Sequence, residues 1–224
     1  MVIRAVLFDL DGTLVDSERE TAEAMARALS RHHQIEIEQY DRDFIVGRSW
    51  LAIYDSLMQR YPHITWSRAE MIDRTAKMRD EVIAELGITV LPGAKSVLEW
   101  TRAAHKRGLV TGSSRQEVMQ VLPHLGEHAA FDTIVAAEDV TRSKPAPDGY
   151  QKAIAELGLA PHECLVIEDS EAGITAGRDA GCTVLAVRAG NFGGWKQDHA
   201  HRVIDTLDEL TPSLLADLVA IVKR

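Results

Sequence analysis

Residues 6–17 read VLFDLDGTLVDS, and this stretch decides the fold. The apolar run at residues 5–8 is long enough for one buried strand and too short for a helix. Gly12 then breaks the strand, because glycine is the usual residue of a tight backbone turn. Asp9 and Asp11 therefore stand one residue apart at the carboxyl end of a buried strand, where open α/β sheets bind their ligands.

Asp9 and Asp11 also fit a plain surface turn, since Asp and Gly often open one. Two carboxylates this close repel each other, so a functional site would need a cation beside them or a proton on one of them. The side chains that decide between the two interpretations must come from elsewhere in the chain.

The composition is that of a globular protein with a substantial core. The chain has 224 residues, of which 46% are hydrophobic and 26% charged, so it fits one large domain or two modest ones. A net charge of −9 argues against a nucleic-acid-binding protein, which would usually carry a basic face. No apolar run reaches membrane-spanning length, and the N-terminal residues do not resemble a signal peptide. We expect a cytoplasmic protein that binds neither nucleic acid nor membrane, and the sequence leaves its oligomeric state open.

The segment from residue 16 to residue 89 reads as helices without a convincing strand. Apolar residues recur at helical spacing, and Pro62 and Gly87 mark helix ends. The helices are expected near residues 17–32, 40–44, 49–61 and 68–86.

From Val90 onward, predicted helices and strands alternate. Helices are expected near residues 93–106, 116–125, 148–157, 171–180 and 214–222, and strands near residues 109–111, 133–136, 164–167 and 182–187. Such alternation predicts a parallel sheet with helices on both faces. The expected fold class is α/β: a three-layer Rossmann-like core built from residues 1–15 and 91–224, with an all-helical cap domain inserted at residues 16–90.

Polar side chains follow four of the predicted strands. They are Asp9 and Asp11, then Thr111-Gly112-Ser113, then Lys144 in the loop after the third core strand, and finally Glu168-Asp169. Each group alone has an ordinary explanation as a turn, a cap or a surface charge. Together they supply carboxylates for a hard cation such as Mg²⁺, and a cation with a hydroxyl for a phosphate.

The motifs that carry these residues resemble a known family. DLDGTLVDS, VTGSS, SKPAPD and VIEDSEAGITAGRDAG are similar to the four signatures of the haloacid dehalogenase-like hydrolase superfamily. More narrowly, the chain resembles the branch of β-phosphoglucomutase and phosphoglycolate phosphatase, which has a helical cap after the first motif. The resemblance covers nearly the whole chain, with the motifs in the same order and spacing.

This resemblance implies a role for each motif residue. Asp9 would be the nucleophile that forms an aspartyl-phosphate, and Asp11 the general acid and base. Mg²⁺ would be held by the Asp9 carboxylate, the backbone carbonyl of Asp11 and Asp169, with Glu168 near by or acting through water. The metal and Lys144 would favour the ionised form of Asp9.

The resemblance also implies how the substrate is bound. Thr111 and the amide of Gly112 would bind the transferring phosphoryl group, and Lys144 would neutralise its charge. Candidates for contacting the leaving group are Arg48 in the cap and Ser113, Ser114 and Arg115 after the second core strand. Arg48 and Arg115 fit equally well as surface arginines at helix starts.

We therefore predict an Mg²⁺-dependent phosphatase acting on a small phosphorylated metabolite, either a sugar phosphate or a phosphorylated organic acid. Asp11 argues against dehalogenation, because the family's dehalogenases lack this aspartate. The alternative is a β-phosphoglucomutase-like phosphosugar mutase. That branch has Val where this chain has Thr13 and a cap histidine near the position of Thr21. A phosphoacceptor signalling module without turnover is a more remote alternative, because neither the helical insert nor Asp11 fits it.

Overall fold

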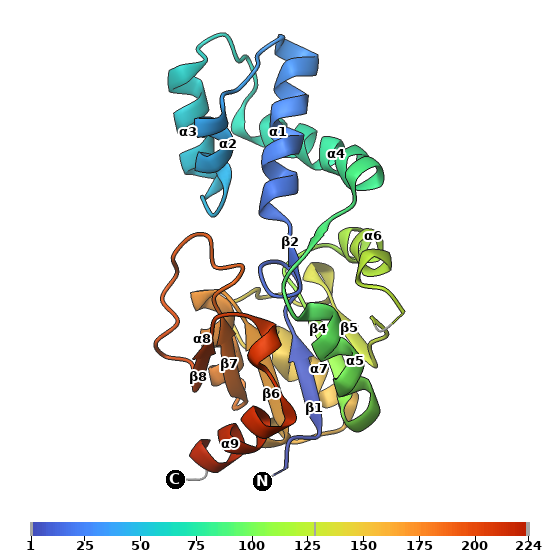
Figure 1. The fold of residues 1–224 in the computed structure, drawn as a ribbon. Helices are drawn as coiled ribbons and strands as arrows, with labels where there is room; N and C mark the ends of the chain where they lie inside the picture. Colours follow the sequence, from blue (N-terminus) through green and yellow to red (C-terminus); the bar gives the residue numbers. More distant parts are fainter. Residues whose placement is uncertain (1, 128, 223–224) are drawn as a thin grey trace. The chain divides into compact units, whose positions relative to one another are not determined.

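The main sheet has six strands in the order β5-β4-β1-β6-β7-β8, and each pairs in parallel with its neighbours. The structure is a computed structural model that describes residues 2–127 and 129–222 (Figure 1). Its strands are β1 (Ala5–Phe8), β4 (Lys106–Val110), β5 (Thr133–Val135), β6 (Cys164–Glu168), β7 (Thr183–Val187) and β8 (Arg202–Ile204). This arrangement confirms the predicted α/β class with a parallel sheet.

Helices cover both faces of this sheet. They are α5 (Ala94–Ala104), α6 (Arg115–Leu125), α7 (Asp148–Leu157), α8 (Glu171–Asp179) and α9 (Pro212–Val222). Residues of α7 and α8, such as Ile154 and Ile174, pack with Leu7 and Val166 of the strands in one buried cluster. Figure 1 shows α5 in front of the sheet and α7 behind it. The strands β1, β6 and β7 are buried throughout, as expected for a parallel sheet covered on both sides.

The segment after β1 is helical, as the sequence predicts. It contains α1 (Glu18–His33), α2 (Gln39–Ile45), α3 (Trp50–Arg60) and α4 (Arg68–Leu86). These helices have a core of their own, which includes Met25, Leu29, Leu57 and Met71. Asp16 accepts hydrogen bonds from the amides of Glu18 and Arg19 at the start of α1, so this carboxylate stabilises the first turn.

The described residues fall into two compact units. Residues 16–89 form one together with residues 192–194, and the rest form the other. The chain passes between the units through two-residue strands, β2 (Val15–Asp16) and β3 (Thr89–Val90), which pair in a small second sheet. The domain boundaries expected from the sequence stay a prediction, because they concern whether each unit folds independently. Residues 1, 128, 223 and 224, which the expected core domain includes, lie outside the described residues.

Two local predictions were wrong. The helix expected to reach residue 106 ends at Ala104, and the strand expected at residues 109–111 starts at Lys106. The amide of Lys106 donates to the carbonyl of Arg4, so pairing beside β1 extends the strand into polar residues. Strand β8 was not predicted, because its three residues are too few to show the alternating hydrophobic pattern of a strand. None of the helices in the described part of the chain combines the length and apolar character needed to cross a bilayer.

Candidate active site

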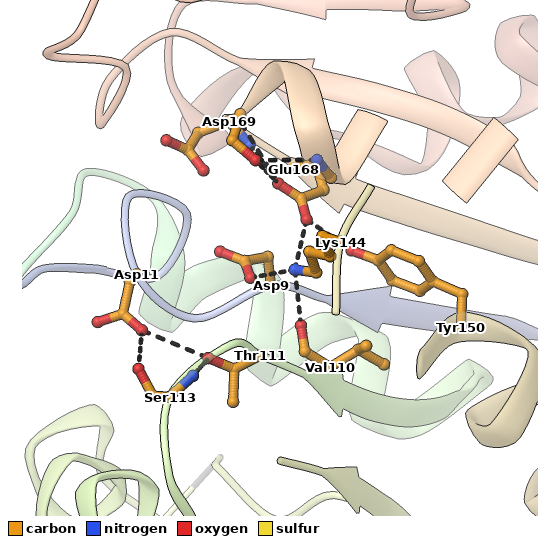
Figure 2. A network of polar contacts seen from close by, with 11 residues as sticks. Asp9, Asp11, Val110, Thr111, Ser113, Lys144, Tyr150, Glu168 and Asp169 are labelled. Atoms are coloured by element: carbon orange, nitrogen blue, oxygen red, sulfur yellow. Dashed lines mark hydrogen bonds and ion pairs between the residues drawn. The ribbon is translucent and has the colours of Figure 1, made fainter. Parts of the chain in front are cut away.

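Strand order brings the motif residues to one edge of the sheet. Strand β1 lies between β4 and β6, and Phe8 is in register with Leu109 and Ile167. The residues at the carboxyl ends of these three strands therefore lie side by side. Figure 2 shows Asp9, Thr111 and Glu168 converging there, together with Lys144 from the loop before α7.

Lys144 is the centre of the polar network. Its Nζ donates to Asp9 Oδ1 at 2.5 Å, to Glu168 Oε1 at 2.6 Å and to the carbonyl oxygen of Val110 at 3.0 Å (Figure 2). Although burial lowers it, the carboxylates of Asp9 and Glu168 raise the pKa of Lys144 above its ordinary value. The ammonium is therefore charged and held in one position beside Asp9.

Glu168 also holds the Lys144 ammonium in place. Its Oε1 also accepts a hydrogen bond from the Tyr150 hydroxyl at 2.7 Å. Its Oε2 accepts from the amides of Asp169 and Ser170 and from the Ser170 hydroxyl. Glu168 is fully buried, and these bonds compensate its carboxylate for lost water. Sequence reasoning missed Tyr150, because an aromatic residue on a helix facing a sheet reads as ordinary core.

The two aspartates of the first motif lie in different surroundings. Asp11 Oδ2 accepts hydrogen bonds from the hydroxyls of Ser113 at 2.6 Å and Thr111 at 3.4 Å, whereas Asp9 contacts Lys144. Thr111 Oγ1 in turn accepts from the Ser113 amide at 3.0 Å. The side chain of Asp11 thus turns toward the loop after β4 and away from the acidic cluster (Figure 2).

Three buried carboxylates are grouped closely enough to hold one metal ion. Oxygen atoms of Asp9, Glu168 and Asp169 lie within 4.8 Å of one another. Burial, and then the charge of Glu168, raise the pKa of Asp9 to about 8, because they outweigh the opposing effect of Lys144. Burial and Glu168 also hold the pKa of Asp169 well above its usual range. With all three carboxyls ionised, the cluster would carry more negative charge than Lys144 neutralises, and hard oxygen ligands of this kind fit Mg²⁺.

A cavity of about 300 Å³ adjoins this network in the same unit. Thr111, Gly112 and Lys144 line it, together with Tyr150 and apolar residues of the neighbouring loops. A Cβ on Gly112 would meet no atom within 4 Å, so the backbone at this position is open to a ligand. The cavity has room for a phosphoryl group beside Lys144.

The remaining predicted substrate residues have other partners. Ser114 caps α6 by accepting from the Glu117 amide and donating to its carboxylate. Arg115 pairs with Asp139 at 2.5 Å, and Arg48 lies over the ring of Phe44, 5.3 Å from its centroid. Arg48 belongs to the helical unit. Of the predicted leaving-group contacts, the structure brings only Ser113 to Asp11, and the substrate roles of all four stay predictions.

The fold and the site define an α/β enzyme whose reacting groups lie at the carboxyl edge of a parallel sheet. The profile of the haloacid dehalogenase-like hydrolases matches residues 6–187, so the chain belongs to this family.

Two similar proteins have named activities. Hexitol phosphatase A of Escherichia coli is 34% identical over 200 residues, which cover 84% of this chain and 85% of that protein. The N-acetylmuramic acid 6-phosphate phosphatase of Pseudomonas aeruginosa is 33% identical over 229 residues, covering 93% and 96%.

A solved structure agrees on the fold. CbbY from Rhodobacter sphaeroides, solved in complex with phosphate, superposes with a TM-score of 0.75 at 24% identity, covering 96% of this chain and all of that one.

Proposed function

We propose that this protein is a phosphatase that uses Mg²⁺ to hydrolyse a small phosphomonoester, a sugar phosphate or a phosphorylated organic acid. The observation that carries the proposal is the contact of Lys144 with Asp9 beside the acidic cluster, while Asp11 is held separately by Ser113. The named activities of the two similar phosphatases support the same reaction class.

The reaction is a double displacement at phosphorus. The carboxylate of Asp9 forms a bond to phosphorus while the bond to the leaving oxygen breaks, giving an aspartyl-phosphate. Asp11 gives its proton to the leaving oxygen. It then takes a proton from the water that attacks phosphorus, and the bond from Asp9 to phosphorus breaks to release inorganic phosphate. The separate hydrogen bonds of the two aspartates support this division.

The other residues position and neutralise the phosphoryl group. Lys144 offsets its negative charge, and Thr111 with the Gly112 amide binds its oxygens, the electrostatic contribution that dominates phosphoryl transfer. Mg²⁺ would be held by Asp9, Asp169 and the backbone carbonyl of Asp11, and when bound it supplies positive charge beside the phosphoryl oxygens. We assign Glu168 to holding Lys144, because both of its oxygens already accept hydrogen bonds.

A phosphosugar mutase is the alternative. It would keep the phosphoryl group on Asp9 long enough to return it to a second hydroxyl. Thr13 stands where the mutase branch has Val, and Thr21 lies near the position of its cap histidine, which supports hydrolysis. Structural similarity to a putative β-phosphoglucomutase from Thermotoga maritima, at 24% identity, concerns the fold alone.

The test is a screen of the purified protein against sugar phosphates, phosphoglycolate, nucleotides and phosphoamino acids, with and without Mg²⁺. We expect release of inorganic phosphate from at least one class, dependent on Mg²⁺. Asp9→Asn should lower kcat at least about a thousandfold, because the amide is a poor nucleophile.

The matched control is Asp205→Asn, which makes the same carboxylate-to-amide change at an exposed position and should keep full activity. A folded, active Asp9→Asn protein would refute the assignment of the nucleophile, and failure of every phosphomonoester would refute the phosphatase. Sugar-phosphate isomerisation exceeding phosphate release would favour the mutase instead.

A further inference from the structure

Gln197 is a buried polar residue that has no part in the mechanism proposed above. It lies in the loop between β7 and β8, and its exposed fraction is 7%. In the sequence it stands in a polar, glycine-rich stretch, NFGGWKQDHA at residues 191–200, where a glutamine is typical of an exposed loop. A carboxamide is costly to bury unless its polar atoms find hydrogen-bond partners, so the contacts of this side chain indicate its role.

The Gln197 carboxamide joins the ends of two neighbouring strands. Its Nε2 donates to the carbonyl oxygen of Asp169 at 2.6 Å and to the carbonyl oxygen of Val187 at 2.7 Å. Because carbonyl oxygens only accept hydrogen bonds, the nitrogen of the side chain, and not its oxygen, must face them. The side-chain amide of Gln197 therefore uses both of its N–H groups on backbone carbonyls.

These two carbonyls lie just beyond the last pair of β6 and β7. That pair joins Glu168 to Ala186 in the register of the two parallel strands. Asp169 and Val187 are the next residues of the two chain segments. Gln197 thus bridges the two segments where their own pairing ends, and it ties the position of Asp169 to the end of β7.

Hydrogen bonds hold the backbone of Asp169 on both sides. The amides of Asp169 and Ser170 donate to Glu168 Oε2 at 3.2 Å and 3.3 Å. The carbonyl of Asp169 belongs to the same peptide unit as the Ser170 amide, and it accepts from Gln197. Because a peptide unit is planar, holding it at its N–H and at its C=O fixes its orientation. The backbone from which the Asp169 side chain extends is therefore fixed as well.

The side chain of Asp169 has little room to adjust. One of its oxygens lies within 4.8 Å of oxygens of Asp9 and Glu168. A Cβ added at Gly12 would lie 2.3 Å from Asp169 Oδ2, so the carboxylate packs directly against the turn of the first motif. A rotation of the Asp169 backbone would therefore move the carboxylate out of the acidic cluster.

We propose that Gln197 is a positioning residue for the metal site: by holding the Asp169 carbonyl, it keeps the Asp169 carboxylate in the cluster where it would hold Mg²⁺. Groups that orient a metal ligand through hydrogen bonds contribute to the affinity for the metal without touching it. This inference rests on the proposed function, in which Asp169 is a ligand of Mg²⁺. Because Gln197 contacts the backbone of that residue and none of the reacting groups, its effect falls on the affinity for the metal.

Calorimetric titration of the metal-free protein with Mg²⁺ tests the inference without a substrate. Gln197→Met keeps the length of the side chain and removes both donors. We expect it to weaken Mg²⁺ binding at least about tenfold, or about 1.4 kcal/mol, as is typical when a group that orients a metal ligand is removed. Gln197→Asn is milder, because it keeps the carboxamide but is one methylene too short to reach both carbonyls. It should weaken binding at least about threefold.

The matched control is Asn191→Leu, because Asn191 is a carboxamide that joins backbone groups in the same loop. Its side chain donates to the carbonyl oxygen of Trp195 at 2.8 Å and accepts from the Trp195 amide at 2.7 Å. Loosening the loop without releasing Asp169 should change the affinity for Mg²⁺ less than about twofold. Circular dichroism and chemical denaturation of the metal-free proteins show that each variant is folded and how much stability it has lost.

The outcomes separate this inference from the proposed function. Wild-type affinity for Mg²⁺ in a folded Gln197→Met or Gln197→Asn protein would overturn the inference and leave the proposed function standing. Equal losses of affinity in Gln197→Met and Asn191→Leu would also overturn it, because they would trace the effect to the loop as a whole. A wild-type protein that binds no Mg²⁺ would refute the proposed use of Mg²⁺, and this inference with it.

Discussion

Glu168 belongs to the acidic cluster and is also a residue that holds Lys144. The resemblance places it near the metal, yet its carboxylate accepts hydrogen bonds from Lys144, Tyr150, Ser170 and two backbone amides. Glu168 and Asp9 hold the Lys144 ammonium between them, and Tyr150, which donates to Glu168, also lines the adjoining cavity.

Asp9 gives a prediction about pH. Burial and Glu168 raise its pKa to about 8, so metal-free protein at pH 6 carries a proton on this carboxyl. A metal ligand must be deprotonated, so Mg²⁺ has to displace that proton. The proton on Asp9 alone should therefore make the affinity for Mg²⁺ rise by up to about tenfold per pH unit from pH 6 to pH 8. Calorimetric titration in two buffers of different ionisation enthalpy measures both the affinity and the protons released.

The sign of this effect follows from the direction of the shift. Below the pKa of about 8 the protonated form dominates and opposes the metal, and above it the ionised form is already present. Mg²⁺ binding that releases no proton at pH 6.5 would contradict the prediction. Titration of the Asp205→Asn protein, in which the exposed carboxylate is changed, should give the wild-type pH dependence.

At the scale of the element, the turn between β6 and α8 is built around Glu168. Ser170 accepts a hydrogen bond from the Gly173 amide at 3.0 Å and donates to Glu168, so the first turn of α8 is joined to the end of β6. A Cβ added at Gly173 would lie 1.8 Å from Glu168 Oε1, closer than any real contact. Glycine is needed here because the helix passes directly over the carboxylate that holds Lys144.

Gly173→Ala should therefore displace Glu168 and disturb Lys144. We expect a loss of stability of about 1–3 kcal/mol, typical of overpacking, together with a fall in kcat of at least about tenfold. Chemical denaturation and steady-state kinetics measure the two effects. Gly158→Ala is the control: it costs about 1–2 kcal/mol of left-handed backbone strain but meets no atom within 4 Å, and it should keep kcat. Unchanged kcat in a folded Gly173→Ala protein would contradict the role of this contact.

At the scale of the whole molecule, the two compact units have separate cores. One cluster contains Leu7, Tyr150 and Val166, and the other contains Met25 and Leu57. Units with cores of their own can unfold in separate steps. The acidic cluster belongs entirely to the unit that contains the sheet.

Calorimetry tests this separation. We expect two unfolding transitions, with Mg²⁺ raising the temperature of only one of them, since a ligand stabilises the folded state that binds it by about 2.7 kcal/mol at a concentration of 100 Kd. Asp169→Asn should remove the effect of Mg²⁺ and leave the other transition unchanged. A single two-state transition would show that the two units unfold together.

Much of the architecture can be predicted from local patterns in the sequence. The apolar run of β1 and the alternation after Val90 predict the parallel sheet, and the helical spacing of residues 16–89 predicts the inserted helices. The strands and helices are local features, because hydrophobic period, turn residues and strand ends are written in neighbouring residues. That Asp9, Lys144 and Asp169 share one site is implied by the resemblance of the four motifs to a known family.

What only the tertiary structure decided is which distant groups meet. Asp11 and Ser113 are 102 residues apart, and Lys144 and Asp9 are 135 apart, so no local pattern specifies their hydrogen bonds. Nor does any local pattern specify the hydrogen bond from Tyr150 to Glu168. The sequence by itself determined the strands, the helices and the reactive residue types. Packing of the whole chain determined the neighbours of β1, because strand pairing depends on every element that must share the core. Those neighbours decide that the Asp9 carboxylate faces Lys144 and that the Asp11 carboxylate faces the hydroxyls of the loop after β4.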